Sequence, residues 1–493
     1  MNTIRNFVLG LATAGFLAAA PAHSTDLWDV YQLALKNDPA FAQAQANYQA
    51  QVENKAIARA GYLPNLNFNA SRQRNENNGD QIAQTPSGIG LVNFQSTTYN
   101  TNYNLRLTQP IFNWAAWKSM DQADASVAQA AATFEAAKQD LILRTATAYF
   151  NVLNARDTLA ANHANKIALA KQLEQAKEKY QVGMSAVTDV QEAQAAYDLA
   201  VATEIGAQQQ VTTTEEQLRA ITGVPVTNLQ EPIPDMPLHS PDPSNAKQWV
   251  QQALKQNPNL LSAQSAAKAA SANVGIKEAG HLPTLDVVAT HNKNHTTGNN
   301  IFSLSDTTGN TVMLQLSLPI FSGGGTSAQV TQAQRQYDAA QDQAKLVMRQ
   351  TEQQTRTAYL GVLTGISQVQ AYKQSVQSNE TSLNATETGM QVGTRTIVDV
   401  LNQRQSLLTA QTNFANSRYK YLESVLQLKQ AAGILAPKDL RQINSLMQVA
   451  APNPTVTPDD TSGSGAGDMS ASGDKSTGTK PATDNSDSSN DGG

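Results

Sequence analysis

The sequence lacks cysteine, contains few charged residues, and has no long apolar run beyond its N-terminus. None of its 493 residues is Cys, only 15% are charged and 6% are aromatic. Without cysteine the chain cannot form disulfides, thiolate metal sites, a cysteine nucleophile or a lipid anchor on an N-terminal Cys. A membrane-spanning helix needs about 20 consecutive apolar residues, so the chain is not a bundle of such helices.

The formal net charge of -5 is concentrated in one segment. Residues 452–493 contain seven Asp and two Lys, and the rest of the chain carries 33 basic and 33 acidic residues. This even balance indicates no basic face, which argues against a nucleic-acid partner. Because 452–493 is rich in Ser, Gly, Thr and Pro and has almost nothing to bury, we expect a disordered acidic tail there.

The first 24 residues have the pattern of a secretory signal peptide. Arg5 supplies a positive charge, Phe7 to Ala20 form a short apolar segment, and small residues follow. The apolar segment is too short to span a bilayer. The alternative is a buried N-terminal helix. The pattern favours a signal peptide over residues 1–24 and a mature chain outside the cytoplasm.

Most of the chain consists of two related halves. Three motifs of the first half return in the second at an offset of about 210–219 residues. The pairs are Ala34–Pro39 with Ala253–Pro258, Gly61–Leu66 with Gly280–Leu285, and Leu105–Phe112 with Leu314–Phe321. A link between the halves contains six prolines and cannot be one helix. We therefore divide the chain into repeat 1 (25–222), a Pro-rich link (223–245), repeat 2 (246–436) and a C-terminal segment (437–451).

Each half predicts very long helices. Between Asn113 and Val182 there is neither Gly nor Pro, and a helix of that length would extend about 105 Å. In the second half, apolar residues recur every seven positions at Val400, Leu407, Phe414, Tyr421 and Leu428. A sustained seven-residue period is typical of helices packed side by side with a left-handed supercoil. The predicted helices cover 39–60, 113–182 and 187–222 in repeat 1, and 258–280, 326–391 and 398–432 in repeat 2.

Each half also predicts two strands with one apolar face. Residues 99–107 place Tyr, Thr, Tyr, Leu and Leu at every second position, with Asn or Arg between them. The predicted strands cover about 64–74, 98–109, 283–292 and 311–319. Strands of about 9–11 residues with one apolar face fit a transmembrane β-barrel. Any one of them would also fit a half-buried soluble sheet, but four such strands beside giant helices favour the barrel.

Four strands are too few to close a barrel within one chain. Single-chain barrels of this bacterial type have at least eight strands, and an open edge in lipid leaves backbone groups without hydrogen bonds. A barrel must therefore be shared between chains. Two chains would give eight strands and an interior filled by side chains, whereas three would give twelve and leave room for a pore.

These motifs resemble those of the TolC-type outer-membrane efflux protein family. The resemblance rests on the duplicated unit, the Leu-Pro before each first strand, the Pro-Ile-Phe after each second strand, and above all residues 392–400, Val-Gly-Thr-Arg-Thr-Ile-Val-Asp-Val. It implies an α+β membrane protein, a homotrimer with a twelve-strand transmembrane barrel in the lipid of the outer membrane. A twelve-helix tunnel would continue the barrel into the periplasm, with an equatorial belt containing the link 223–245 and the segment 437–451.

The resemblance also implies a function without catalysis. The trimer would be an exit duct for drugs or secreted proteins, docked to a periplasmic adaptor and to an inner-membrane transporter of the RND, ABC or MFS type. Arg395 matches a gate arginine that ties neighbouring coils through the positions of Thr188 and Asp189, and Asp399 matches an acidic constriction at the periplasmic mouth. The adaptor contacts would be Val182, Gly183, Val392, Gly393 and Thr394.

Two positions depart from the family pattern. Met390 stands where a gate tyrosine is expected, and Asn402 stands where a second acid can occur. The proposed gate and adaptor residues also have simpler structural explanations. The two aspartates are placed to cap the helices that follow the turns, Arg395 would serve as a solvated surface charge, and a tight turn alone requires the glycines.

The sequence contains no catalytic or cofactor motif. We find no His-Glu-x-x-His, no phosphate-binding loop and no Gly-x-Ser-x-Gly. His281, His291 and His295 lie near a predicted strand without an acidic cluster, so we expect no metal site and no cofactor. A soluble periplasmic helical scaffold is the main alternative to a channel. The apolar strand faces argue against it, because a scaffold needs no stripe that faces lipid.

Overall fold

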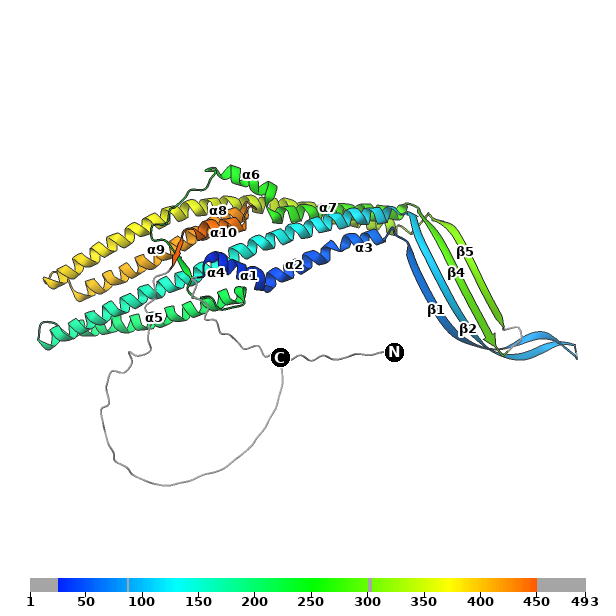
Figure 1. Ribbon diagram of the computed structural model, residues 1–493, viewed down its shortest axis with the longest axis horizontal. Helices are drawn as coiled ribbons and strands as arrows, with labels where there is room; N and C mark the ends of the chain where they lie inside the picture. The colour runs from blue at the N-terminus through cyan, green and yellow to red at the C-terminus, as the bar shows by residue number, and fades with distance from the viewer. Residues whose placement is uncertain (1–24, 87, 300–303, 450–493) are drawn as a thin grey trace, which may run out of the picture. The chain divides into compact units, whose positions relative to one another are not determined.

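The computed structural model describes residues 25–86, 88–299 and 304–449 (Figure 1). The expected signal peptide at 1–24 and the expected tail at 452–493 lie outside these residues. The first half contains α1 (Leu27–Asn37), α2 (Pro39–Val52), α3 (Asn54–Ala60), β1 (Asn65–Thr85), β2 (Gly88–Phe112), α4 (Trp114–Gln181) and α5 (Val187–Thr222). After β3 (Gln230–Pro232), the second contains α6 (Ala246–Gln256), α7 (Pro258–Glu278), the 3-10 turn η1 (Ala279–His281), β4 (Thr284–Gly298), β5 (Ser305–Ser317), α8 (Gly325–Gln391), α9 (Ile397–Ala431), α10 (Pro437–Asn444) and β6 (Met447–Val449).

Two helices dominate the chain. Helices α4 and α8 have 68 and 67 residues, so each extends about 100 Å. Each is followed by a tight turn, and α4 packs against α5 while α8 packs against α9 (Figure 1). The two hairpins also contact each other through α4 and α9. None of the helices in the part of the chain described above is both long and apolar enough to cross a bilayer.

Shorter helices pack beside the long ones. Helices α1, α2 and α3 contact α4, and α7 contacts both α4 and α8. The sequence predicts one helix over 39–60, whereas the structure has α2 and α3 separated at Glu53. The backbone of Glu53 stays near helical angles, with φ -66° and ψ -17°. The interruption is therefore a small irregularity in the hydrogen bonding of a nearly continuous helix. The sequence contains no Gly or Pro there that would signal it.

The four long strands form one antiparallel sheet in the order β1-β2-β4-β5. The first hairpin pairs continuously from Asn65 opposite Thr108 to Thr85 opposite Gly88. The β2–β4 pairing ends where Gly298 faces Thr98, so the outer part of the first hairpin extends past its neighbour. Strands β1 and β5 are the edges, and among the residues with described structure neither has a second partner strand.

Strands β1 and β2 are longer than the predicted 64–74 and 98–109. Residues 75–97 are rich in Asn, Gln and Gly and carry no sustained apolar alternation. The strand structure of 75–85 and 88–97 depends on backbone hydrogen bonds within the hairpin. Because every residue type except proline can make these bonds, they leave no pattern of side chains in the sequence.

One face of the sheet is apolar and exposed. Leu66, Phe68, Leu314 and Leu316 are 64%, 65%, 66% and 67% exposed. The strand register places them on one face, because residues directly opposite each other point to the same side. The other face carries polar residues such as Asn67, which lies opposite Arg106. The sheet therefore has an apolar surface that the described residues do not cover.

The main apolar core lies where the two helical hairpins meet the link. It includes Leu27 and Val30 of α1, Leu141 and Leu153 of α4, Leu218 of α5, Leu426 of α9 and Leu440 of α10. Two buried tyrosines attach the link to this core. Tyr149 Oη donates to the Gln230 carbonyl and Tyr359 Oη donates to the Ser244 carbonyl, each at 2.8 Å. Strand β3 of the link also pairs with β6 near the C-terminal end of the described chain.

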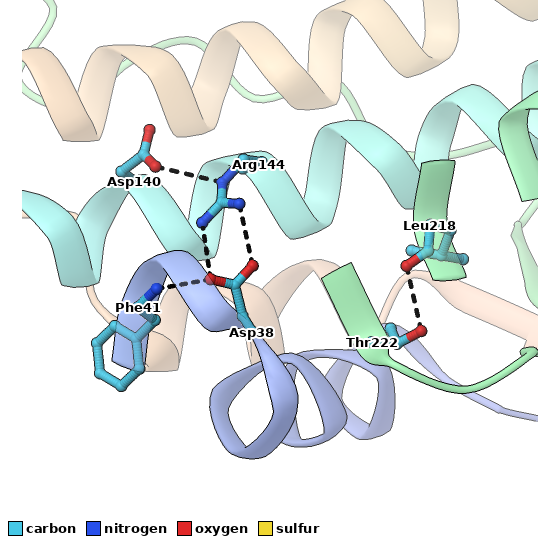
Figure 2. A network of polar contacts seen from close by, with 6 residues as sticks. All are labelled: Asp38, Phe41, Asp140, Arg144, Leu218 and Thr222. Atoms are coloured by element: carbon cyan, nitrogen blue, oxygen red, sulfur yellow. Dashed lines mark hydrogen bonds and ion pairs between the residues drawn. The ribbon is translucent and has the colours of Figure 1, made fainter. Parts of the chain in front are cut away.

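A buried ion pair attaches the start of α2 to α4 (Figure 2). Arg144 Nη1 and Nη2 donate to the two carboxylate oxygens of Asp38 at 3.0 and 3.3 Å. Asp38 also caps α2 by accepting the Phe41 N–H at 2.6 Å. Asp140 Oδ2 lies 3.3 Å from Arg144 Nε and is largely exposed. A buried carboxylate is costly unless it is paired, so this contact determines where α2 joins α4.

Candidate functional site at the two helix tips

The first tip is the turn between α4 and α5. Gly183 has φ +75°, a left-handed conformation that favours glycine. The Met184 N–H donates to the Lys179 carbonyl at 2.8 Å, and the Gly183 N–H donates to the Tyr180 carbonyl at 3.0 Å. These bonds satisfy the last carbonyls of α4. They hold the turn while the Val182 side chain stays 70% exposed.

The second tip, between α8 and α9, has the same construction. Gly393 has φ +79°, and its N–H donates to the Met390 carbonyl at 3.2 Å. The Thr394 N–H and hydroxyl both donate to the Gly389 carbonyl, at 2.8 and 3.0 Å. Val392 is 71% exposed. The five residues predicted to contact an adaptor therefore lie on two hydrogen-bonded turns that each expose a valine.

Asp399 closes a capping box at the start of α9. Thr396 Oγ1 accepts the Asp399 N–H at 3.3 Å. In return Asp399 Oδ2 accepts the N–H and the hydroxyl of Thr396 at 2.9 and 3.0 Å. These two donors, together with the nearby charge of Arg395, lower the pKa of the Asp399 carboxyl below its usual value. The carboxylate stays ionised, and one of its roles is to cap the N-terminus of α9.

Asp189 is held differently. The residue at the N-cap of α5 is Ala186, which has no capping side chain, so Asp189 is not the N-cap. Its Oδ2 accepts a hydrogen bond of 2.5 Å from Ser185 Oγ. Thr188 beside it is exposed. Asp189 therefore holds Ser185 of its own turn, and no side chain in the described ranges donates to its other carboxylate oxygen.

Arg395 is exposed directly after the second tip. Its aliphatic stem packs over Gly389, where an added Cβ would lie 2.8 Å from Arg395 Cγ. Within the described parts of the chain, no hydrogen bond or ion pair joins the Arg395 guanidinium to Thr188 or Asp189. The three predicted gate residues are therefore not brought together inside one chain.

Sequence reasoning missed the contacts between the two coils behind the tips. Gln172 Nε2 of α4 donates to Met390 Sδ of α8 at 3.6 Å, so Met390 joins the hairpins at the position where the family pattern has tyrosine. A small apolar cluster lies beside it and consists of Leu173, Ala176, Ala193, Val190, Tyr197 and Ile397. The apolar Ile397, at the start of a helix near the tip, was the available signal.

The second hairpin has polar ties of its own. Arg404 of α9 pairs with Glu387 of α8. Gln403 Nε2 donates to Asn379 Oδ1 at 3.0 Å. Asn402 is exposed near Asp399. Arg404 thus has a carboxylate partner inside the hairpin.

A charged triad, also missed from the sequence, joins α4 to α5. His163 Nδ1 lies 2.6 Å from Glu204 Oε1, and Lys166 Nζ lies 2.7 Å from Glu204 Oε2. Burial acts to raise the pKa of Glu204, but the hydrogen bonds from Lys166 and His163 outweigh it and lower the pKa below the usual value. Lys166 stands seven residues from both Leu159 and Leu173 on α4, and its pairing with Glu204 on α5 explains why a lysine is accommodated at this spacing.

The three histidines do not form a cluster. His291 Nδ1 lies 2.6 Å from Asn310 Oδ1, and His295 Nδ1 lies 3.8 Å from an oxygen of Asp306. His281 belongs to η1. In the described ranges, no three His, Asp or Glu side chains are grouped closely enough to hold a metal ion.

A family model described as "Outer membrane efflux protein" matches residues 30–224 and 249–434. These ranges contain both helical hairpins and all four long strands. The chain belongs to the outer membrane efflux protein family. It is 35% identical to the outer membrane protein TolC of Escherichia coli over 461 residues, which are 91% of this chain and 90% of TolC. It is also 29% identical to the alkaline protease secretion protein AprF of Pseudomonas aeruginosa, with 86% and 87% covered.

The fold of this outer membrane efflux protein is similar to a solved channel structure. The Campylobacter jejuni CmeC outer membrane channel matches it with a TM-score of 0.68 at 21% identity, over 86% of this chain and 90% of CmeC. At that identity the match shows the shared fold alone. Family membership confirms the predicted family and outer-membrane location, and it makes the chain a channel protein and not an enzyme.

Proposed function

We propose that three copies of this chain close a twelve-strand β-barrel in the outer membrane and continue it as a twelve-helix periplasmic tunnel. The observation that carries the proposal is the four-stranded sheet, which has an exposed apolar face and two edges that no other described strand pairs with. A sheet in lipid must satisfy every backbone N–H and C=O. Strand β1 of one copy therefore pairs with β5 of the next.

Three copies fit the sheet better than two. An eight-stranded barrel is just wide enough for side chains to fill it, whereas larger barrels enclose a channel. The face opposite the apolar one carries polar residues, among them Asn67, Asn104 and Arg106. Such residues suit a water-filled interior. The link 223–245 and the segment 437–451 form the equatorial belt, and the pairing of β3 with β6 supports placing them together.

The trimer serves as an exit duct for drugs, secreted proteins or both. It acts when docked to a periplasmic adaptor and an inner-membrane transporter of the RND, ABC or MFS type. Membership of an efflux family supports drugs as cargo. The similarity to an alkaline protease secretion protein supports secreted proteins as cargo.

The two tips are the docking points for the adaptor. Val182 and Val392 are 70% and 71% exposed although both are apolar. The turns that carry them are fixed by hydrogen bonds at Gly183, Gly393 and Thr394. A rigid turn with an exposed apolar side chain gives a partner a surface to bind without ordering a loop.

The periplasmic end is closed by contacts between neighbouring coils. In this arrangement the Arg395 guanidinium donates to Thr188 and Asp189 of an adjacent coil. The exposed position of Arg395 supports it. So does the Asp189 carboxylate, which among the described side chains is bound only by Ser185. Three Asp399 carboxylates converge at the mouth, and in each copy the hydrogen bonds from Thr396 favour the charged form against the repulsion of the other two. Such rings favour cations.

A soluble helical scaffold is the alternative function. The exposed apolar face of the sheet speaks against it, because a protein in water gains nothing from leaving that face uncovered. Cell fractionation and planar-bilayer recording separate the two. A channel sediments with the outer membrane, is extracted by detergent as a trimer and gives unit conductance steps. A stable, water-soluble monomer without conductance would refute the channel.

A further inference from the structure

The apolar face of the sheet ends, on the side of the hairpin turns, in a group of basic and aromatic residues. The register places Arg72 and Arg74 of β1, Tyr99 and Tyr103 of β2, and Lys293 of β4 on this face, and we call these five residues the outer basic patch. The guanidinium carbons of Arg72 and Arg74 lie 5.6 and 5.9 Å from the centre of the Tyr99 ring. The two arginines are thus gathered around one aromatic side chain.

The outer basic patch lies at the level where the apolar surface ends. Leu285 and Leu316 form an apolar pair near the helices. Phe68 and Leu105 form the last apolar pair before the patch, in a row that continues across the sheet as His291 and Asn310. The strand extends about 26 Å from Leu285 to Lys293. At the usual strand tilt of about 40° this is about 20 Å along the membrane normal, most of the ~25 Å apolar band of outer-membrane barrels. In the proposed trimer the hairpin turns face outward, so the patch lies at the boundary of the outer leaflet.

The described residues neutralise only part of the positive charge of the patch. In the described residues, no carboxylate pairs with Arg72 or Lys293. The nearest acids on the same face are Glu76, which pairs with Arg74, and Asp306, which lies 3.8 Å from His295. Both arginines and Lys293 are exposed. Two cationic side chains are therefore left for an external anion.

We infer that the outer basic patch binds the phosphorylated headgroup of an anionic outer-leaflet lipid. Arginine presents a planar fork that matches phosphate oxygens in pairs. Lys293 lies two strands from β1, or about 10 Å, a span that two long side chains can bridge through one phosphate. Tyr99 and Tyr103 lie where aromatic rings of barrels contact headgroups. Phe68 and Leu105 then contact the acyl chains. The inference rests on the proposed function, since the sheet must face lipid.

Native mass spectrometry of the purified trimer in a non-ionic detergent tests the inference. The probe is lipid A with two phosphates. We expect wild-type trimers to bind it and the triple variant R72Q/R74Q/K293Q to bind about 25-fold more weakly, because each of the two unpaired basic residues near a headgroup contributes roughly a fivefold factor, whereas Arg74 already pairs with Glu76. The single variant K293Q, at an exposed position, should lose about fivefold.

A matched control comes from the same sheet. Arg106 lies on β2 but on the opposite face, between Asn67 and Thr290. R106Q removes one positive charge without touching the outer basic patch and should bind lipid A as the wild type does. Dephosphorylated lipid A should bind no better to the wild type than to the triple variant. Millimolar inorganic phosphate should not displace the lipid, because it lacks the acyl chains.

Three results would overturn the inference. They are equal binding by wild type and triple variant, equal binding of phosphorylated and dephosphorylated lipid, and full displacement of the lipid by inorganic phosphate. The same spectra separate this failure from failure of the proposed function. Intact trimers without phosphate-dependent lipid binding refute only the headgroup site, whereas the absence of trimers refutes the barrel.

Discussion

The carboxylate of Asp38, 2% exposed, accepts two hydrogen bonds from Arg144 and one from the Phe41 backbone. Asn257 occupies the corresponding place before α7 in the second half. It accepts N–H groups of Asn259 and Leu260 at 3.0 and 3.2 Å and donates to the Ala431 carbonyl at 2.9 Å. Both halves therefore cap a helix after the same turn. One half ties the cap to a guanidinium and the other to a backbone carbonyl.

We expect D38A to destabilise the protein by about 2–3 kcal/mol. The change removes a helix cap, worth about 1 kcal/mol, and charge-assisted hydrogen bonds worth about 1.5–3 kcal/mol, reduced because Arg144 is partly exposed. The thermal midpoint of the helical circular dichroism signal in detergent measures the effect. D140A removes the exposed partner of the same arginine and should cost under about 1 kcal/mol. Equal losses in both variants would contradict the assignment.

Gly433 should tolerate no side chain. It has φ +75°, and an added Cβ would lie 2.5 Å from the Gln256 carbonyl oxygen and 2.6 Å from Asn257 Cα. Both are backbone atoms, so G433A should cost roughly 3 kcal/mol from strain and overpacking. G183A is the matched control, because Gly183 has the same φ but nothing within 4 Å of its added Cβ. It should cost about 1 kcal/mol. Comparable midpoints for the two variants would show that no clash exists at Gly433.

R395E should open the channel. The change places a negative charge beside Asp189 of the neighbouring coil and removes a charge-assisted hydrogen bond, worth about 1.5–3 kcal/mol. Single-channel conductance in a planar bilayer should rise. R404Q is the control, since Arg404 pairs with Glu387 inside its own hairpin, and its conductance should stay near the wild-type value. Intact trimers of R395E with wild-type conductance would exclude Arg395 from the gate.

Asp399 should be responsible for block by trivalent cations. D399N keeps an oxygen that accepts the Thr396 N–H but removes the charge, so block and cation preference should disappear while α9 stays folded. N402D adds a second acid near Asp399 and should strengthen block. Added salt should weaken block in the wild type, because exposed charges are screened. Block that persists in D399N would place the constriction elsewhere and leave Asp399 as a cap.

The pH dependence of the same block has a predicted sign. The Thr396 N–H and hydroxyl lower the pKa of Asp399 below 3.8. In the ring the other two carboxylates act to raise this pKa. The two hydrogen bonds within each copy counteract them, and block should be closely similar at pH 5 and pH 7. The capping box stabilises α9 above the unfolded pKa, and this contribution is lost as the pH falls through the lower folded pKa. Current recordings at pH 5 and pH 7 check the prediction for block, and a clear drop in block at pH 5 would contradict it.

The long helices and the apolar strand face were accessible from the sequence for simple reasons. A segment free of Gly and Pro with a seven-residue period has few alternatives to a helix, and alternation at residues 99–107 marks a face. The strand extension at 75–97 was not accessible, because backbone pairing leaves no side-chain pattern. The contact of Gln172 with Met390 joins residues 218 positions apart, and no local periodicity reports such a pair. The gate stays a prediction, because it requires a second chain.

Disulfide cross-linking between the free edges tests the shared barrel most directly. The natural chain has no cysteine, so two introduced cysteines are the only thiols. N69C on β1 would be combined in turn with T311C, M313C and Q315C on β5, which share the polar face of the sheet. We predict that at least one pair gives a ladder on non-reducing gels that ends at three chains. A ladder that ends at two chains, one that continues beyond three, or the absence of cross-links in all three pairs would contradict the twelve-strand barrel.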